Sequence, residues 1–184
     1  MDAIEAIMTR RSIRKYTDKQ IPEEVVQQIL QVAMAAPSAG NEQPWHFIVI
    51  KDRNTLLKVT AFHPHAHMLK EAALAMLVCS DPELEKFKGR GILDCSAATE
   101  NILLAAHAMG LGAVWLGIYP VEERMAGMRK LLGLPSHIIP LSLVSMGYPN
   151  EDLKAENRFK SERVHHERWM GDRGLHQKGT RKLK

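Results

Sequence analysis

Three polar side chains near the amino terminus, Arg10, Ser12 and Arg14, have the chemistry and spacing of an anion site. In an extended segment, side chains two residues apart project from the same face. The two guanidiniums are always charged, and each can donate paired hydrogen bonds to phosphate oxygens. Arg11 alternates away in a strictly extended chain, but the segment leaves a helical pattern, so Arg11 remains a candidate. An exposed basic turn between two helices is the alternative interpretation.

A second polar stretch, Pro37-Ser38-Ala39-Gly40-Asn41-Glu42-Gln43-Pro44-Trp45, lies between a helical pattern and an apolar run. Its polar side chains and free backbone amides suit a flat, polar heterocycle. Taken alone it could be an ordinary loop, because Pro-Ser and Gly-Asn are common turn formers. A phosphate site together with a heterocycle site describes a mononucleotide such as FMN. We interpret Trp45 as core or interface filling rather than as a stacking partner.

These two segments resemble the FMN-dependent nitroreductase family, whose members usually carry an R-x-S-x-R/K segment followed by P-S-x-x-N-x-Q-P-W. The stretch Gly110-Leu-Gly-Ala-Val-Trp-Leu-Gly117 is similar to the family's turn and strand beside the flavin. Arg158 stands where the family has a basic residue near its end. The resemblance covers about residues 3–169. Each motif is weak alone, whereas four in the family's order and at similar intervals are specific.

The resemblance implies a fold, an assembly and a set of binding residues. The implied fold is α+β, with a central, mostly antiparallel sheet flanked by helices. The implied assembly is an intertwined homodimer that holds two flavins in clefts between the chains. The FMN-binding residues that it implies are Arg10, Arg11, Ser12, Arg14, Pro37, Ser38, Ala39, Asn41, Gln43, His67, Leu116, Gly117 and Arg158.

The resemblance also implies how these residues divide around the flavin. Residues 37–39 would lie against the isoalloxazine and come from the subunit opposite the one that supplies residues 10–14. The backbone amide of Gly117 would face flavin N5, and Leu116 would cover the ring's edge. Arg158 would complete the anion site, with Lys160 and Arg163 as competing candidates. Many relatives place a basic residue near the flavin pyrimidine where this chain has His67, so that contact differs here.

The implied activity is reduction of nitroaromatic, quinone or similar small acceptors by NADH or NADPH in a ping-pong order. The bound cofactor carries the hydride, so no catalytic side chain is required. The chain has no G-x-S-x-G motif, no recognisable pair of catalytic carboxylates and no Cys–His signature. The alternatives are reductive dehalogenation, flavin cleavage or ene-reduction on the same scaffold. A non-catalytic flavin- or nucleic-acid-binding protein is the alternative from another class.

Composition favours one domain over residues 1–170, followed by a basic, flexible tail over 171–184. The net charge of +4 is concentrated in that tail, and no nucleic-acid-binding motif accompanies it. Nucleic acid is therefore not an expected partner. No apolar run approaches the roughly 20 residues of a membrane span, and no signal peptide is evident, so a cytoplasmic location is expected. Cys79 and Cys95 lie in apolar patterns and are interpreted as buried free thiols.

Apolar periodicity predicts helices over 22–36 and 95–109 and a further helix between Pro120 and Gly133. It predicts strands over 46–50, 74–79, 113–118 and 141–146. Asp94 is the expected N-cap of the second helix, and Gly110 its expected stop. This helix is apolar around most of its circumference, so we expect it at the centre of the domain or at a subunit interface. Gly110-x-Gly112 is not a dinucleotide fingerprint, because it follows a helix and precedes a strand.

The alternating histidines His63, His65 and His67 form the one sequence pattern that suggests a metal. No cysteine or acidic residue stands at a ligand-like spacing from them, and Pro64 indicates a loop. We therefore interpret the pattern as an exposed loop and expect no metal site.

Overall fold

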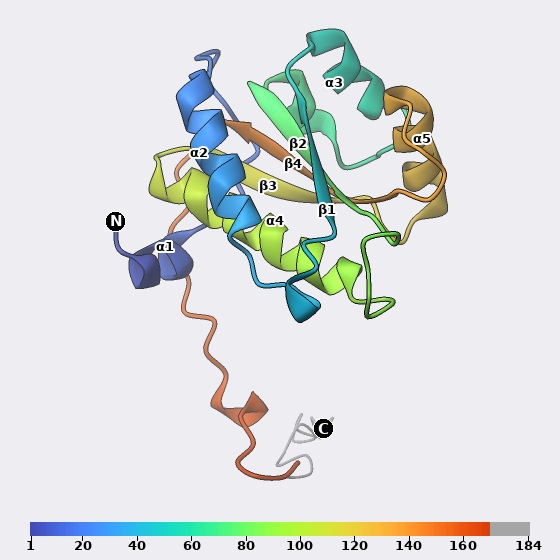
Figure 1. Cartoon of the computed structure of the whole chain (residues 1–184). Helices are drawn as coiled ribbons and strands as arrows, with labels where there is room; N and C mark the ends of the chain where they lie inside the picture. The colour runs from blue at the N-terminus through green and yellow to red at the C-terminus, as the bar shows by residue number, and fades with distance from the viewer. Residues whose placement is uncertain (170–184) are drawn as a thin grey trace, which may run out of the picture.

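The computed structural model describes residues 1–169, so the expected tail over 171–184 lies outside the described residues (Figure 1). Its centre is a four-stranded antiparallel sheet in the order β1-β2-β4-β3. The strands are β1 (Trp45–Ile50), β2 (Leu74–Ser80), β3 (Gly112–Gly117) and β4 (Ile139–Gly147). The expected α+β class is confirmed, and each predicted strand ends within two residues of its predicted bounds.

Helices cover both faces of the sheet. The α-helices among residues 1–169 are α1 (Ala3–Thr9), α2 (Glu23–Met34), α3 (Arg53–Val59), α4 (Gly91–Ala108) and α5 (Glu122–Leu132). Short 3₁₀ turns add η1 (Ala39–Asn41), η2 (His67–Lys70) and η3 (Ser161–Arg163). The helices α2 and α4 pack on one face, whereas α3 and α5 pack on the other (Figure 1).

The strand β2 shows how the sequence builds this three-layer arrangement. Its alternate residues Leu74, Met76 and Val78 enter the core beneath α2 and α4. The intervening Ala75, Leu77 and Cys79 enter the core beneath α3 and α5. Side chains of a strand alternate between faces, so a strand covered on both faces must be apolar at every position. This is why β2 reads as one continuous apolar run.

The long helix α4 is buried on several sides, as its all-round apolar sequence predicts. The prediction that Asp94 caps it is wrong, because the helix begins one turn earlier, at Gly91. Asp94 lies in the first turn, where the helix dipole favours an acid. Its Oδ1 accepts a hydrogen bond from the backbone N–H of Ala39, 3.2 Å away, instead of capping its own helix. Gly110 follows the helix with φ +78°, as expected of a stop.

The two cysteines are free and buried, as predicted. Burial raises the pKa of Cys79 to about 12. Burial also raises the pKa of Cys95 to about 12. Trp45 is buried in the core, which agrees with its interpretation as a packing residue. No helix among residues 1–169 combines the length and the apolar character needed to cross a bilayer.

The segment after α1 runs along the outer edge of β3. Ser12 pairs with Ala113 in parallel orientation, and the N–H of Ile13 donates to the Ala113 carbonyl at 3.0 Å. Gly112 permits this approach, because a Cβ at that position would overlap the Ile13 side chain. The hydroxyl of Tyr16 then fixes the segment: it donates to the Ile13 carbonyl at 2.8 Å and accepts from the Ser145 hydroxyl at 3.0 Å. Burial raises the pKa of Tyr16 well above its ordinary value, so this donor stays protonated.

Replacing Tyr16 with Phe is expected to lower the free energy of unfolding by about 1–3 kcal/mol, because it leaves the buried Ser145 hydroxyl and Ile13 carbonyl with one partner fewer. In Tyr16→Phe/Ser145→Ala the loss should be smaller than the sum of the two single losses, because the two hydroxyls disappear together. Chemical unfolding of the four proteins measures both quantities. Tyr119→Phe, at a position 41% exposed, is the matched control. If the loss of unfolding free energy in the double variant equals the sum of the two single losses, the proposed coupling is contradicted.

Candidate functional site

Arg10 carries a buried guanidinium nitrogen, Nε, that has no hydrogen-bond partner among the described residues. The nearest acid, Glu100, places Oε1 3.6 Å away, which forms an ion pair but exceeds hydrogen-bond length. An unpaired buried N–H costs free energy, and an anion at this position would remove that cost. The sequence predicts an anion for this segment, and that assignment stays a prediction.

The neighbouring residues of this segment have separate roles. Arg11 donates to backbone carbonyls of Lys154 and Glu156, so its guanidinium joins the amino-terminal segment to the carboxy-terminal one. Arg14 is exposed, and its side chain bonds only to the Ser12 carbonyl, at 3.2 Å, among the described residues. Its charge is therefore open to a ligand.

The described chain after β4, which includes Arg158, extends away from the body of the molecule (Figure 1). Arg158 is exposed, and its Nε is 3.8 Å from Glu156 Oε2. The competing candidates Lys160 and Arg163 are exposed as well. The structure brings this segment near Arg11, whose guanidinium donates to the Lys154 and Glu156 carbonyls.

The second predicted segment is a loop of fixed shape. The Ser38 hydroxyl accepts from the Gln43 N–H at 3.0 Å, and the Gln43 side chain donates to Asn41 Oδ1 at 3.1 Å. Asn41 and Gln43 both have positive φ, at 56° and 53°. Such backbone strain persists only where the surroundings enforce it, and it is common at binding sites. Pro37 and the side chains of Asn41 and Gln43 are exposed, so the loop presents them outward.

The two predicted segments lie at opposite parts of α4 in one chain. Ala39 is bonded to Asp94 in the first turn of the helix, whereas Thr9 Oγ1 is 2.8 Å from His107 Nε2 in the last turn. At about 1.5 Å of rise per residue, these two attachments are about 20 Å apart. Arg10 itself forms an ion pair with Glu100, six residues or about 9 Å along the helix from Asp94. Among the described residues no hydrogen bond or ion pair joins residues 10–14 to the loop over 37–43.

Gly117 ends β3 with its amide directed to the free edge of the strand. The Ala113 carbonyl accepts from Ile13 at that edge. Backbone groups of alternate residues in a strand point the same way, so the N–H of Gly117 points away from β4. A methyl group added at Gly117 would meet no atom within 4 Å, so open space adjoins it. Leu116 is buried in the core beneath α3 and α5.

His63 is expected in an exposed loop with His65 and His67, and for His63 this is wrong. It is only 2% exposed, because it stands four residues after the buried Val59 and continues the buried face of α3. That spacing from α3 is a signal that could have identified it. His65 and His67 are exposed, so the histidine pattern is divided between core and surface.

The ring of His63 anchors the end of β3. Its Nδ1 accepts from the His65 N–H at 3.3 Å, and this assigns the proton of the neutral ring to Nε2. Nε2 then donates to the Gly117 carbonyl at 3.1 Å. Arg124 donates to the same carbonyl at 2.8 Å. Burial lowers the pKa of His63, so the ring stays neutral.

The sequence pattern that defines the nitroreductase family matches residues 7–78 and 66–148 of this chain. The chain belongs to the nitroreductase family. This agrees with the resemblance carried by the four motifs, and the expected family fold is confirmed by solved structures.

A relative from Methanothermobacter thermautotrophicus, provisionally named an NADH dehydrogenase/NAD(P)H nitroreductase, is 51% identical over 92% of this chain and 88% of its own length. The structure of an FMN-dependent nitroreductase from Clostridium difficile is similar with a TM-score of 0.84 at 31% identity, over 90% of this chain and 99% of that one. A protein from Desulfovibrio desulfuricans, provisionally named a nitroreductase and solved in complex with FMN, has a TM-score of 0.80 at 32% identity, over 92% of this chain and 99% of that one.

Replacing His63 with Gln should weaken the pH dependence of stability. The pKa of His63 is lower in the folded chain than in the unfolded chain. Below about pH 6.5 the unfolded chain therefore binds a proton at His63 more readily than the folded chain does, so wild-type stability falls as the pH drops. The amide of the introduced glutamine can still donate to the Gly117 carbonyl but cannot titrate. Urea unfolding at pH 7.5, 6.5 and 5.5 should show that the free energy of unfolding falls less with pH in His63→Gln than in the wild type. Burial also lowers the pKa of His107, so His107 accounts for part of the fall that remains. His65→Gln is the control, and an unchanged slope in His63→Gln would refute the linkage.

Proposed function

We propose that this chain is an FMN-dependent oxidoreductase that uses NADH or NADPH to reduce nitroaromatic, quinone or similar small acceptors in a ping-pong order. One observation carries the proposal: the basic segment over residues 10–14 and the outward-facing amide of Gly117 lie along the same edge of the sheet. Ser12 meets β3 at Ala113, and Gly117 stands four residues further along, about 13 Å away. A phosphate at one end and a ring at the other suit an elongated mononucleotide. The names of the Clostridium difficile and Desulfovibrio desulfuricans proteins support FMN as that mononucleotide.

Each predicted residue has a place in this proposal. The phosphate would be held by Arg10, Arg11, Ser12 and Arg14, with Arg158 completing the site. On one side the ring would contact the partner subunit's loop, through the partner's Pro37, the partner's Ser38, the partner's Ala39, the partner's Asn41 and the partner's Gln43. On the other side it would contact Leu116, Gly117 and His67 of the subunit that binds the phosphate. When bound, FMN supplies the hydride-transfer chemistry, and the protein supplies orientation and electrostatics.

The protein's own contribution centres on Gly117. Its N–H is a fixed donor that would orient the ring at N5, because Arg124 and His63 hold the adjoining carbonyl in place. The missing side chain leaves the space beside this amide open for a ring and a substrate. Positive charge from Arg14 would stabilise negative charge on the pyrimidine side, where His67 would also lie. Protons can come from water.

We further propose that the working form is a homodimer with each flavin between two chains. The two predicted segments make no hydrogen bond or ion pair with each other among the described residues of one chain, and this supports the proposal that each finds its complement on the other chain. Members of the family are generally dimeric. The helix α1 exposes Ile4, Ile7 and Met8 at 70%, 53% and 58%, a set of apolar side chains that a second chain would cover. Within the dimer, residues 1–170 of each chain form one domain.

An absorbance spectrum followed by anaerobic titration tests the function. We expect the purified protein to be yellow, or to become yellow on incubation with FMN. Addition of NADH or NADPH should bleach the flavin band, and a nitroarene or quinone should restore it. An iodinated phenol in place of these acceptors tests the dehalogenase alternative. A protein that stays colourless with FMN, or whose flavin neither nicotinamide reduces, would exclude the proposal.

Replacing Arg10 with Ala should weaken FMN binding. A hydrogen bond to a charged group contributes roughly 1.5–3 kcal/mol, so the dissociation constant should rise about 10- to 150-fold. Quenching of FMN fluorescence on binding measures it. Lys58→Ala removes an exposed positive charge from α3, on the other face of the sheet, and should leave the constant unchanged. Equal FMN affinity in Arg10→Ala and wild type would remove Arg10 from the phosphate site.

A further inference from the structure

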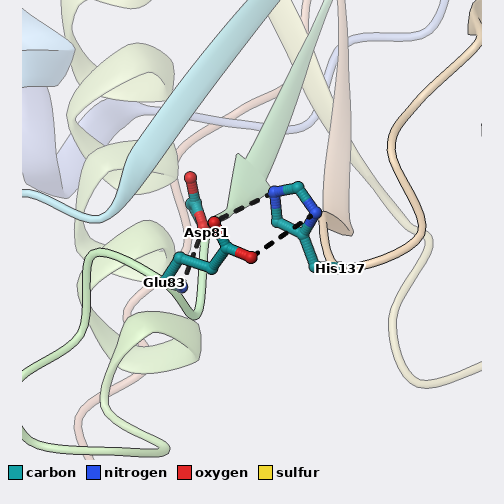
Figure 2. A group of neighbouring side chains, drawn as sticks. All are labelled: Asp81, Glu83 and His137. Atoms are coloured by element: carbon teal, nitrogen blue, oxygen red, sulfur yellow. Dashed lines mark hydrogen bonds and ion pairs between the residues drawn. The ribbon is translucent and has the colours of Figure 1, made fainter.

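A second group of polar side chains gathers where β2 ends and β4 begins, outside the residues assigned to the flavin. Asp81 and Glu83 follow β2, and His137 precedes β4. These strands are antiparallel neighbours with Ser80 opposite Ile139, so the two loops lie side by side. One ligand atom from each of the three side chains lies within 4.8 Å of the others. Figure 2 shows the two carboxylates side by side, with the His137 ring facing them.

The separations suit a cation better than direct hydrogen bonds. His137 Nε2 is 3.9 Å from Asp81 Oδ1, and His137 Nδ1 is 4.0 Å from Glu83 Oε1 (Figure 2). Both exceed hydrogen-bond length. Two ligands about 2.0–2.2 Å from one tetrahedral Zn²⁺ lie roughly 3.3–3.6 Å from each other. The two contacts involve opposite nitrogens of the ring, and an imidazole gives a single ion only one of them. A shift of about half an ångström brings Asp81 Oδ1 to ligand spacing from Nε2, and the Glu83 side chain, which is 74% exposed, can turn its carboxylate toward the same nitrogen.

Asp81 is held in position by its surroundings. The residue is only 8% exposed. Its Oδ2 is 3.1 Å from His46 Nε2, and its Oδ1 accepts from the Glu83 N–H at 2.9 Å. Its own N–H donates to the Pro44 carbonyl at 2.8 Å. Outer partners of this kind orient a metal-binding carboxylate and raise the affinity of its site.

The chemistry of the group matches a divalent transition metal. Two carboxylates supply two negative charges, and a neutral imidazole supplies the nitrogen that Zn²⁺ and its neighbours favour over Mg²⁺ or Ca²⁺. Three protein ligands leave a further coordination position for water. A cavity of about 290 Å³ adjoins the group, lined by His46, Asp81 and His137 together with apolar side chains such as Leu134 and Ile138.

We propose that Asp81, Glu83 and His137 form a binding site for one divalent transition-metal cation, with His46 positioning Asp81. The bound cation clamps the loop before β4 to the loop after β2. Through the Asp81–Pro44 hydrogen bond the clamp extends to the start of β1. The site is independent of the proposed oxidoreductase activity.

Equilibrium dialysis of the full chain, without a histidine tag, against Zn²⁺ tests the site, with bound metal measured by mass spectrometry. We expect saturation at one Zn²⁺ per chain and a rise in melting temperature with Zn²⁺. His137→Ala should weaken binding at least about 100-fold, because loss of an outer partner alone costs about 10–100-fold. Glu83→Gln keeps the shape of an exposed side chain and should weaken binding about 10-fold or more.

The control is His65→Ala, which removes an exposed histidine from the other histidine-rich loop and should bind Zn²⁺ as wild type does. Circular dichroism confirms that each variant is folded, and if His137→Ala is not, Glu83→Gln decides. Absence of saturable binding to the wild type would overturn the proposal. So would wild-type affinity in the folded variants, or loss of binding in His65→Ala.

Discussion

The contact between the amino-terminal segment and the outer edge of β3 determines most of what the candidate site can do. One backbone hydrogen bond, from Ile13 to Ala113, sets the register of residues 10–14. Through strand alternation the same bond shows that Gly117 directs its amide to that edge. The candidate phosphate-binding residues and the outward-facing amide of Gly117 are therefore positioned by the same strand edge. The buried hydrogen bond between Tyr16 and Ser145 fixes the amino-terminal segment against this edge.

Local patterns were enough to predict much of this fold. The apolar runs marked all four strands, and Gly110 ended α4 with positive φ as predicted. The start of α4 could not be predicted in this way, because Asp94 bonds to Ala39, a residue distant in sequence. His63 was misplaced because Pro64 suggested a loop, whereas the deciding feature is a fourth-residue contact with Val59.

The candidate site was accessible to sequence reasoning only in part. The residue types of the anion segment and the loop over 37–43 indicated a mononucleotide, and the family resemblance indicated which one. Sequence periodicity cannot show that Arg10 Nε lacks a hydrogen-bond partner, or that Arg124 and His63 both donate to the Gly117 carbonyl. The grouping of Asp81 with His137 depends on the register of two strands far apart in the chain, so a spacing motif cannot reveal it.

The burial of both thiols has a consequence for the proposed chemistry. Quinones are electrophiles that alkylate thiolates, so an enzyme that turns them over risks modifying itself. Nucleophilic attack requires the thiolate form. With the pKa of Cys79 and of Cys95 at about 12, that form is scarce at neutral pH, and neither sulfur is open to solvent. Electrophilic acceptors would therefore alkylate Cys79 and Cys95 only slowly.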